Sequence, residues 1–166
     1  MAEFKEIPKA RLVMALMYSN KDVYEEATEL LTKKFGEIEF KSDEFDFNFT
    51  TYYEKEFGKP LKKVFIVFKK PIKRKGLVDI RLYTQDLEKK LKQNNKRRIN
   101  IDPGYITKDS LVMASLKEQP YKIYLGKGVF GHMIIMFKKM DIIPFRHSFP
   151  DYLANKDFFL QIRKNL

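Results

Sequence analysis

Three runs of apolar residues in this sequence have the length and composition of buried β-strands. Leu12 to Tyr18 is continuously apolar, Val64 to Phe68 is dense in β-branched and aromatic residues, and Val129 to Phe137 is a third run late in the chain. Apolar runs of this length, separated by polar segments, favour strands over long helices. The chain is therefore expected to fold around a β-sheet.

Three helices are predicted to accompany these strands. Val23, Ala27 and Leu31 share one face of a helix that Asn20 can cap and Gly36 can end. A second helix is expected at about 80–93, and a third from 152 to 165. Each has apolar residues at helical spacing and charged residues on the opposite face.

Shorter segments complete the predicted order of elements. We expect strands at 37–40, 45–49, 99–101, 111–116, 122–125 and 141–145, a helical turn that ends at Gly58, a basic loop at 71–76, a turn at 102–105 and a hairpin at 126–128. This order predicts an α+β fold, with a single mixed or mainly antiparallel sheet, two packed helices and a C-terminal helix. A chain of 166 residues without repeats or linkers is expected to form a single domain over 1–166.

The net charge of +11 is concentrated in one quarter of the chain. Residues 61–100 hold fourteen Lys or Arg against three Asp or Glu, whereas residues 1–60 are net acidic. A field of this kind attracts polyanions, so nucleic acid is the first partner that we expect. The residues expected to contact phosphates are Lys73, Arg74, Lys75, Lys96, Arg97 and Arg98. The alternative is a solvated basic face that only keeps the protein soluble.

Several classes of site lack their sequence signatures. The chain has no cysteine, which excludes disulfides and every Cys-ligated metal site. Gly126 to Gly131 matches G-x-G-x-x-G, but a strand follows where a dinucleotide site needs a helix, so we interpret it as a hairpin. His132 and His147 lie in no metal-ligand spacing, and no metal site is predicted from them.

The first residues of the chain do not have the pattern of a secretory signal. Charges interrupt the segment where such a signal needs an apolar run, and the longest apolar stretch is too short to span a bilayer. We therefore expect a cytoplasmic protein with no membrane partner.

Two carboxylates occupy positions suited to chemistry. Glu56 follows a pair of tyrosines, and Asp102 follows Asn100 by two residues, which places both side chains on one face of a strand. An Asn–Asp pair of this kind can bind Mg²⁺ or a ribose, or it can cap the turn that Asp-Pro-Gly predicts. Glu56 and Asp102 are our candidate catalytic residues, with Mg²⁺ as a candidate cofactor.

Four strings together resemble a known family: FDFNFTTYYEKEFG (45–58), RRINIDPGYIT (97–107), YLGKGVF (124–130) and FPDY (149–152). With the opening RLVMALMYS, they are similar to the bacterial family catalogued as domain of unknown function 4416. The resemblance covers nearly the whole chain and implies a complete single-domain member, but it implies little about activity. It points to a shared polar site built from Tyr53, Glu56, Asn100, Asp102 and Lys127, with Tyr105 as a further ligand contact. Turn and packing chemistry is the alternative.

Three functions remain open from the sequence. The first is binding of a phosphate-rich ligand, nucleic acid above all, through the basic residues of 61–100. The second is a nucleotide-binding protein, or a Mg²⁺-dependent enzyme acting on a phosphorylated substrate, in which Lys127 and Arg98 steady phosphates. The third is a scaffold that binds a protein partner.

Overall fold

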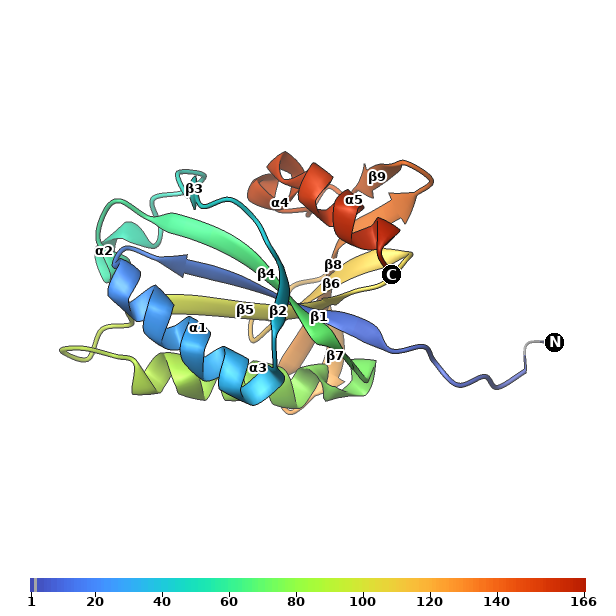
Figure 1. The fold of residues 1–166 in the computed structure, drawn as a ribbon, viewed down its shortest axis with the longest axis horizontal. Helices are drawn as coiled ribbons and strands as arrows, with labels where there is room; N and C mark the ends of the chain where they lie inside the picture. Colours follow the sequence, from blue (N-terminus) through green and yellow to red (C-terminus); the bar gives the residue numbers. More distant parts are fainter. Residues whose placement is uncertain (2) are drawn as a thin grey trace.

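The centre of the sheet is strand β1 (Ala10–Tyr18), which has an antiparallel neighbour on each side. These neighbours are β4 (Lys62–Ile72) and β5 (Ile99–Ile106). The structure is a computed structural model that describes residues 1 and 3–166. Because β4 and β5 are both antiparallel to β1, they are parallel to each other, and helix α3 (Leu77–Lys90) makes the crossover between them (Figure 1).

Within the described residues, nine strands form one sheet with the order β2-β4-β1-β5-β6-β8-β7, while β3 pairs with β4 and β9 pairs with β8. Every pairing is antiparallel. The remaining elements are α1 (Lys21–Phe35), β2 (Ile38–Lys41), β3 (Phe45–Asp46), α2 (Glu54–Phe57), the 3-10 turn η1 (Arg74–Gly76), β6 (Ser110–Ser115), β7 (Ile123–Gly126), β8 (Val129–Lys138), β9 (Asp141–Pro144), α4 (Pro150–Ala154) and α5 (Lys156–Lys164). The predicted α+β class with one sheet is confirmed.

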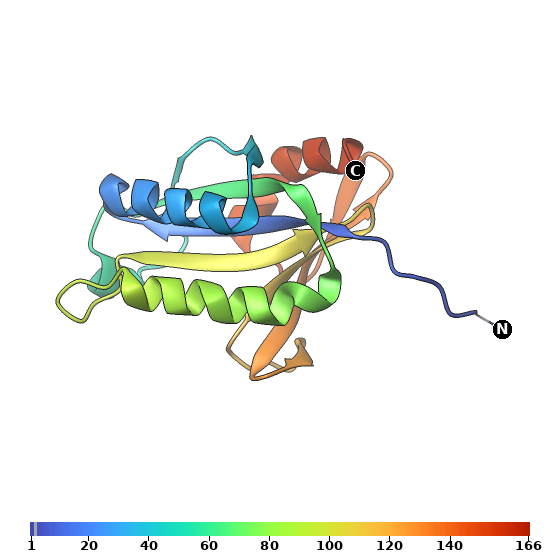
Figure 2. The ribbon, with the colours of Figure 1, turned by 60° about the horizontal axis from the view of Figure 1, so that its bottom comes forward.

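Helices cover both faces of the central strands, which explains why β1 is apolar from Leu12 to Tyr18. Leu12, Met14 and Leu16 point to a core shared with α1 and α3. Val13 and Ala15 point to the opposite core, which α4 and α5 complete. A strand covered on both faces has no solvent-facing side and therefore no polar alternation. Figure 2 shows α1 and α3 side by side along these strands, with α5 beyond the sheet.

The ends of α1 form as the sequence predicts. The side chain of Asn20 accepts a hydrogen bond from the N–H of Asp22 at 2.7 Å, and Gly36 ends the helix with a φ of +95°. The hairpin at 126–128 is also confirmed, since three successive residues with positive φ join β7 to β8.

The turn predicted at 102–105 is wrong, because Asp102 to Tyr105 lie within β5. On one edge, β5 pairs with β1 along its whole length. On the other edge, it pairs with β6 only from Gly104 onward, so residues 99–103 have no strand partner there. Pro103 therefore lies where no strand partner needs its missing N–H. Gly104 lies opposite Met113, and a Cβ on it would come within 2.4 Å of the Val112 carbonyl oxygen. The Pro-Gly pair thus permits a close strand contact, not a turn.

Other boundaries differ from the predictions as well. The strand expected at 45–49 stops at Asp46, β4 extends to Ile72 and shortens the basic loop, and α3 runs from 77 to 90 in place of 80–93. The helix expected at 152–165 is two helices that meet at Asn155. The Asn155 side chain donates to the Asp151 carbonyl at 2.8 Å, a local bond that competes with the regular helix.

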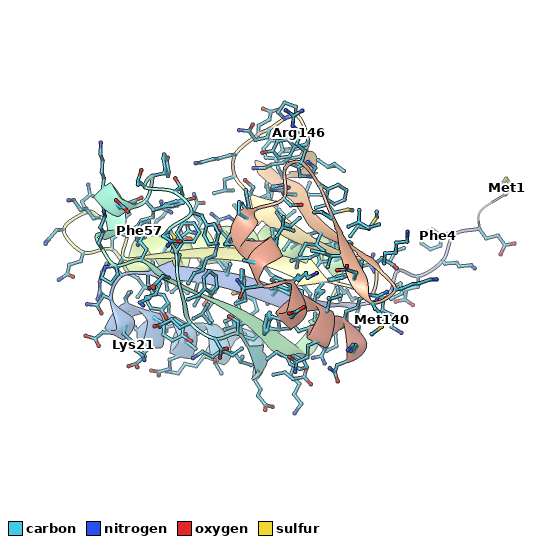
Figure 3. All side chains as sticks on the ribbon, turned by 90° about the horizontal axis from the view of Figure 1, so that it is seen from above. Met1, Phe4, Lys21, Phe57, Met140 and Arg146 are labelled. Atoms are coloured by element: carbon cyan, nitrogen blue, oxygen red, sulfur yellow. The ribbon has the colours of Figure 1, made fainter. Side chains whose placement is uncertain are left out.

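The N-terminal residues lie outside the sheet. Figure 3 shows Phe4 on a segment that stands clear of the rest of the molecule, and its side chain is fully exposed. In the described part of the chain, no helix has the length and apolar character needed to cross a membrane.

Candidate functional site

A cleft of about 610 Å³ opens where β5 and β6 separate. The two strands pair over three positions, Gly104 to Ile106, after which β6 continues beside β8. The middle of α3 borders one side of the cleft, and Tyr52, Tyr53 and the start of α4 border another. The loop 116–122 borders it beyond β6. The hollow therefore lies at the fork between these two strands.

Two side chains of α3 replace the missing strand along the free edge of β5. Glu88 Oε1 accepts a hydrogen bond from the Ile101 N–H at 2.7 Å, and Arg81 Nη1 donates to the Ile101 carbonyl oxygen at 3.2 Å. Both side chains are buried, and burial raises the pKa of Glu88 to about 7. Arg81 Nη1 also donates to Thr84 Oγ1, while its Nε is buried without a partner in the described residues.

Arg97 connects the cleft to helix α2. Its Nε and Nη2 donate to the two carboxylate oxygens of Glu56, and its Nη1 donates to Glu88 Oε2 at 3.3 Å and to Asn100 Oδ1 at 3.2 Å. The ion pair with Arg97 lowers the pKa of Glu56. Both oxygens of Glu56 are therefore engaged, and Glu56 acts here as the partner of an arginine.

Asn100 and Asp102 lie on one face of β5, as predicted from their spacing. Asn100 Nδ2 donates to Asp102 Oδ2 at 2.7 Å, and both residues border the cleft. Among the described residues, no cation lies within 4.0 Å of the Asp102 carboxylate. Asp102 can therefore accept hydrogen bonds from hydroxyl or amine groups of a ligand.

Lys122 brings a half-buried cation to the same cleft. Its Nζ donates to Ser115 Oγ at 2.9 Å and to the Lys117 carbonyl oxygen at 3.1 Å, and both of these acceptors are neutral. Burial and the nearby charge of Lys117 lower the pKa of Lys122, while Asp102 acts in the opposite direction. No carboxylate of the described chain lies within 4.0 Å of this ammonium group.

A stack of rings supports the wall of the cleft beside Lys122. Tyr121 lies parallel to His147 with ring centroids 4.5 Å apart, and His147 lies parallel to Phe145 at 5.1 Å. His132 is buried next to Tyr121, and burial, Lys122 and His147 lower its pKa to about 4. Because Tyr121 is supported from behind and 44% exposed, it offers a fixed surface for a planar ligand.

Tyrosines also border the cleft. Burial raises the pKa of Tyr53, and the charge of Asp102 adds to this effect. Burial likewise raises the pKa of Tyr152, which lies at the start of α4. Tyr52 is largely exposed and lies beneath the ammonium group of Lys117, at 5.0 Å from ring centroid to Nζ. The hydroxyls of Tyr53 and Tyr152 therefore remain protonated donors at neutral pH.

The structure brings together part of the polar site expected from the sequence. Tyr53, Asn100 and Asp102 border one cleft, and Glu56 reaches it through Arg97. Lys127 lies elsewhere, in the β7–β8 turn, where it pairs with Asp79 at 2.8 Å.

Tyr105 also lies outside the cleft lining, with its ring 5.7 Å from the guanidinium carbon of Arg74. The expected phosphate contacts form two groups at opposite ends of α3. Lys73, Arg74 and Lys75 precede the helix, and Lys96, Arg97 and Arg98 follow it, so roughly 21 Å of helix separates them. The second group borders a smaller hollow of about 310 Å³ beside Asn20.

Several residues of the cleft were not expected from the sequence: Arg81, Glu88, Lys117, Lys122 and His132. A signal for two of them exists in α3. Leu77, Arg81, Thr84, Glu88 and Leu91 follow each other at helical spacing and are all buried, so charged residues occupy the inner face of an amphipathic helix. No comparable pattern marks Lys122, which lies in a loop.

The residues present do not form a protein-only Mg²⁺ site. In the described portion of the chain, no three His, Asp or Glu side chains gather where they can hold a metal ion. Glu56, one of the two carboxylates considered for Mg²⁺, is engaged by Arg97.

A sequence profile of the family described as Domain of unknown function (DUF4416) matches residues 8–166. The chain belongs to this family. The DUF4416 match includes β5, the loop 116–122 and α4, and therefore every element that borders the cleft. Neither the curated proteins nor the solved structures include a significant match to the chain. Membership in DUF4416 does not specify an activity, so the function is inferred from the residues of the cleft.

Proposed function

We propose that the cleft binds a small phosphorylated molecule. The observation that carries this proposal is the ammonium group of Lys122, which is half-buried and has only neutral hydrogen-bond partners. A cation removed from water without a compensating anion is costly, and a bound phosphate supplies that anion.

The charges around the cleft support an anionic ligand. Six cationic side chains and two carboxylates border it. Arg97 and Lys89 already pair with carboxylates, at 2.7 Å to Glu56 and 3.2 Å to Asp86. Lys92, Lys117 and Lys122 have no carboxylate within 4.0 Å in the described chain, so three lysines remain for the ligand.

The remaining groups suit the organic part of such a ligand. Asp102 can accept hydrogen bonds from sugar hydroxyls, and Tyr121 offers a supported ring face. Nucleotides and sugar phosphates are the two classes that combine these features. We place this activity in the cytoplasm, as expected from the sequence.

Nucleic-acid binding through residues 61–100 is the second candidate, and the concentration of positive charge in this segment favours it. Two features of the fold weigh against one continuous contact surface. Lys62, Lys63 and Lys69 pair with Asp46, Asp151 and Glu37, and the basic groups at 73–75 and 96–98 lie at opposite ends of α3.

Calorimetry at 50 and 300 mM salt with pyrophosphate, nucleotides, sugar phosphates and a short single-stranded RNA tests both candidates. We expect a small phosphate ligand to bind at both salt concentrations, and Lys122→Met to weaken it by roughly 10- to 100-fold. Lys127→Met removes the same charge outside the cleft and should leave affinity unchanged. Binding of RNA alone, lost at high salt and insensitive to Lys122→Met, would favour the second candidate and contradict the first.

A further inference from the structure

We propose that Lys122 is a carbonyl-reactive amine, which forms an imine with an aldehyde or ketone group of the phosphorylated ligand. This inference rests on the proposed function for its choice of ligand class. It adds a covalent step and narrows the ligand to carbonyl-bearing phosphates.

The position of Lys122 suits a nucleophile. The residue directly precedes β7 and borders the cleft, and two of its three N–H groups are held by Ser115 Oγ and the Lys117 carbonyl oxygen. The amine therefore has one position left, beside these two hydrogen bonds, through which it can contact a ligand. Since no carboxylate within 4.0 Å locks it as a salt bridge in the described chain, it can lose its proton.

The surroundings favour the neutral amine, which is the reactive form. Burial and the positive charge of Lys117 lower the pKa of Lys122, and only the charge of Asp102 on β5 opposes them. His132 on β8 stays neutral above a pKa of about 4. Desolvation and a second cation are the two means by which proteins activate lysine amines.

The reaction balances without an oxidant or reductant. The ammonium group first loses a proton to solvent. The neutral Nζ then attacks the carbonyl carbon: a C–N bond forms, the C=O π bond opens, and one proton moves from nitrogen to the oxygen to give a carbinolamine. The hydroxyl group of the carbinolamine takes up a proton from solvent or an acid and leaves as water as the C–O bond breaks, a C=N bond forms, and the nitrogen releases its last proton to solvent. Tyr53 and Asp102 border the same cleft and can serve as a proton donor and a proton acceptor. Burial keeps the Tyr53 hydroxyl protonated.

The stack behind Tyr121 indicates which carbonyl compound to use as a probe. Tyr121, His147 and Phe145 lie parallel, so a flat ring next to Lys122 meets a rigid surface. Pyridoxal 5′-phosphate combines a phosphate, a flat ring and an aldehyde, and its imine absorbs visible light. It serves here as a probe and not as an assigned cofactor.

The test is reductive trapping. The full chain is mixed with limiting pyridoxal 5′-phosphate at pH 8 and reduced with borohydride, and the labelled lysine is located by peptide mass spectrometry. We expect Lys122 to be labelled at least tenfold faster than any other lysine. Lys122→Arg keeps the charge and should abolish this fast label, while Lys127→Arg should not change it. Thermal unfolding confirms that both variants fold.

Two further arms separate this inference from the proposed function. If pyrophosphate displaces the probe but Lys122 is not labelled, the imine is excluded while phosphate binding stands. If pyridoxal without its phosphate labels Lys122 equally fast and pyrophosphate does not compete, the reactive amine stands and phosphate binding fails. Labels spread over exposed lysines, or placed on Lys92 or Lys117, would overturn the proposal.

Discussion

Arg97 and Glu56 form a two-bond ion pair, in which Nε donates to Oε1 at 2.7 Å and Nη2 donates to Oε2 at 2.8 Å. The pair joins the segment after α3 to helix α2. The third guanidinium nitrogen continues to Glu88 and Asn100. One side chain thus connects α2 to α3 and to the free half of β5, and the last two border the cleft.

Arg97→Lys should lower the free energy of unfolding by about 1–2 kcal/mol, because an ammonium group cannot make the paired bonds of a guanidinium. Urea unfolding measures this change. The matched control is Arg98→Lys, since Arg98 has no carboxylate within 4.0 Å in the described chain, and this variant should differ from the parent by less than about 0.5 kcal/mol. Equal losses in both variants would contradict the assigned role of Arg97.

Gly104→Ala should destabilise the protein by about 2–4 kcal/mol. The new Cβ would lie 2.3 Å from Met113 Sδ and 2.4 Å from the Val112 carbonyl oxygen, and the strand backbone cannot move aside without breaking the β5–β6 pairing. Thermal unfolding of Gly76→Ala provides the control, because a Cβ at Gly76 meets nothing within 4 Å and its φ is −73°. That variant should be neutral or slightly more stable.

Lys63→Met should cost about 3–5 kcal/mol, since it leaves the buried Asp151 carboxylate without its partner. The two groups lie 2.5 Å apart, and the Lys63 ammonium also lies over the rings of Phe47 and Tyr152. A double-mutant cycle with Asp151→Leu should recover part of the loss. The exposed pair of Lys33 and Glu29 has similar geometry, and Lys33→Met there should cost less than about 1 kcal/mol.

Glu88 predicts a specific pH dependence of stability. Its pKa rises from 4.5 to about 7 on folding because the carboxyl group is buried, so the folded state binds its proton more tightly than the unfolded state. The stability from this group is full below pH 4.5 and is lost as the pH rises through 7. Glu88→Gln keeps an acceptor for the Ile101 N–H and removes the ionisation.

Urea unfolding at pH 5 and pH 8 tests this dependence. The loss of stability between the two pH values should be smaller in Glu88→Gln than in the parent, by at most about 3 kcal/mol. Parallel losses in the two proteins would show that another group carries the pH dependence.

Local patterns were sufficient to predict most strands, the first helix and the β7–β8 hairpin. An apolar run, an Asn cap or a glycine with positive φ determines the structure of residues only a few positions away in the chain. The Asp-Pro-Gly string gave a wrong turn prediction because it, too, was interpreted from neighbouring residues alone. Its turn propensity is local, whereas the missing β6 partner of Pro103 and the close approach of Gly104 to Met113 depend on how distant strands separate.

The candidate site was predictable only in part. Asn100 and Asp102 could be paired because two residues apart on a strand share a face. Lys122 could not be placed beside them, since the loop after β6 brings it there from twenty positions further along the chain. Arg81 and Glu88 were open to prediction as charged residues on the inner face of α3.

The peptide group of Ile101, bonded to Glu88 and Arg81 in place of a neighbouring strand, has a consequence for isotope exchange. Protection of a sheet amide from deuterium ordinarily reports separation of two strands. Protection of this amide reports instead whether α3 stays docked, because its acceptor belongs to the helix. The exchange rate of one backbone proton therefore provides a label-free gauge of how tightly that wall is closed, with or without a bound molecule.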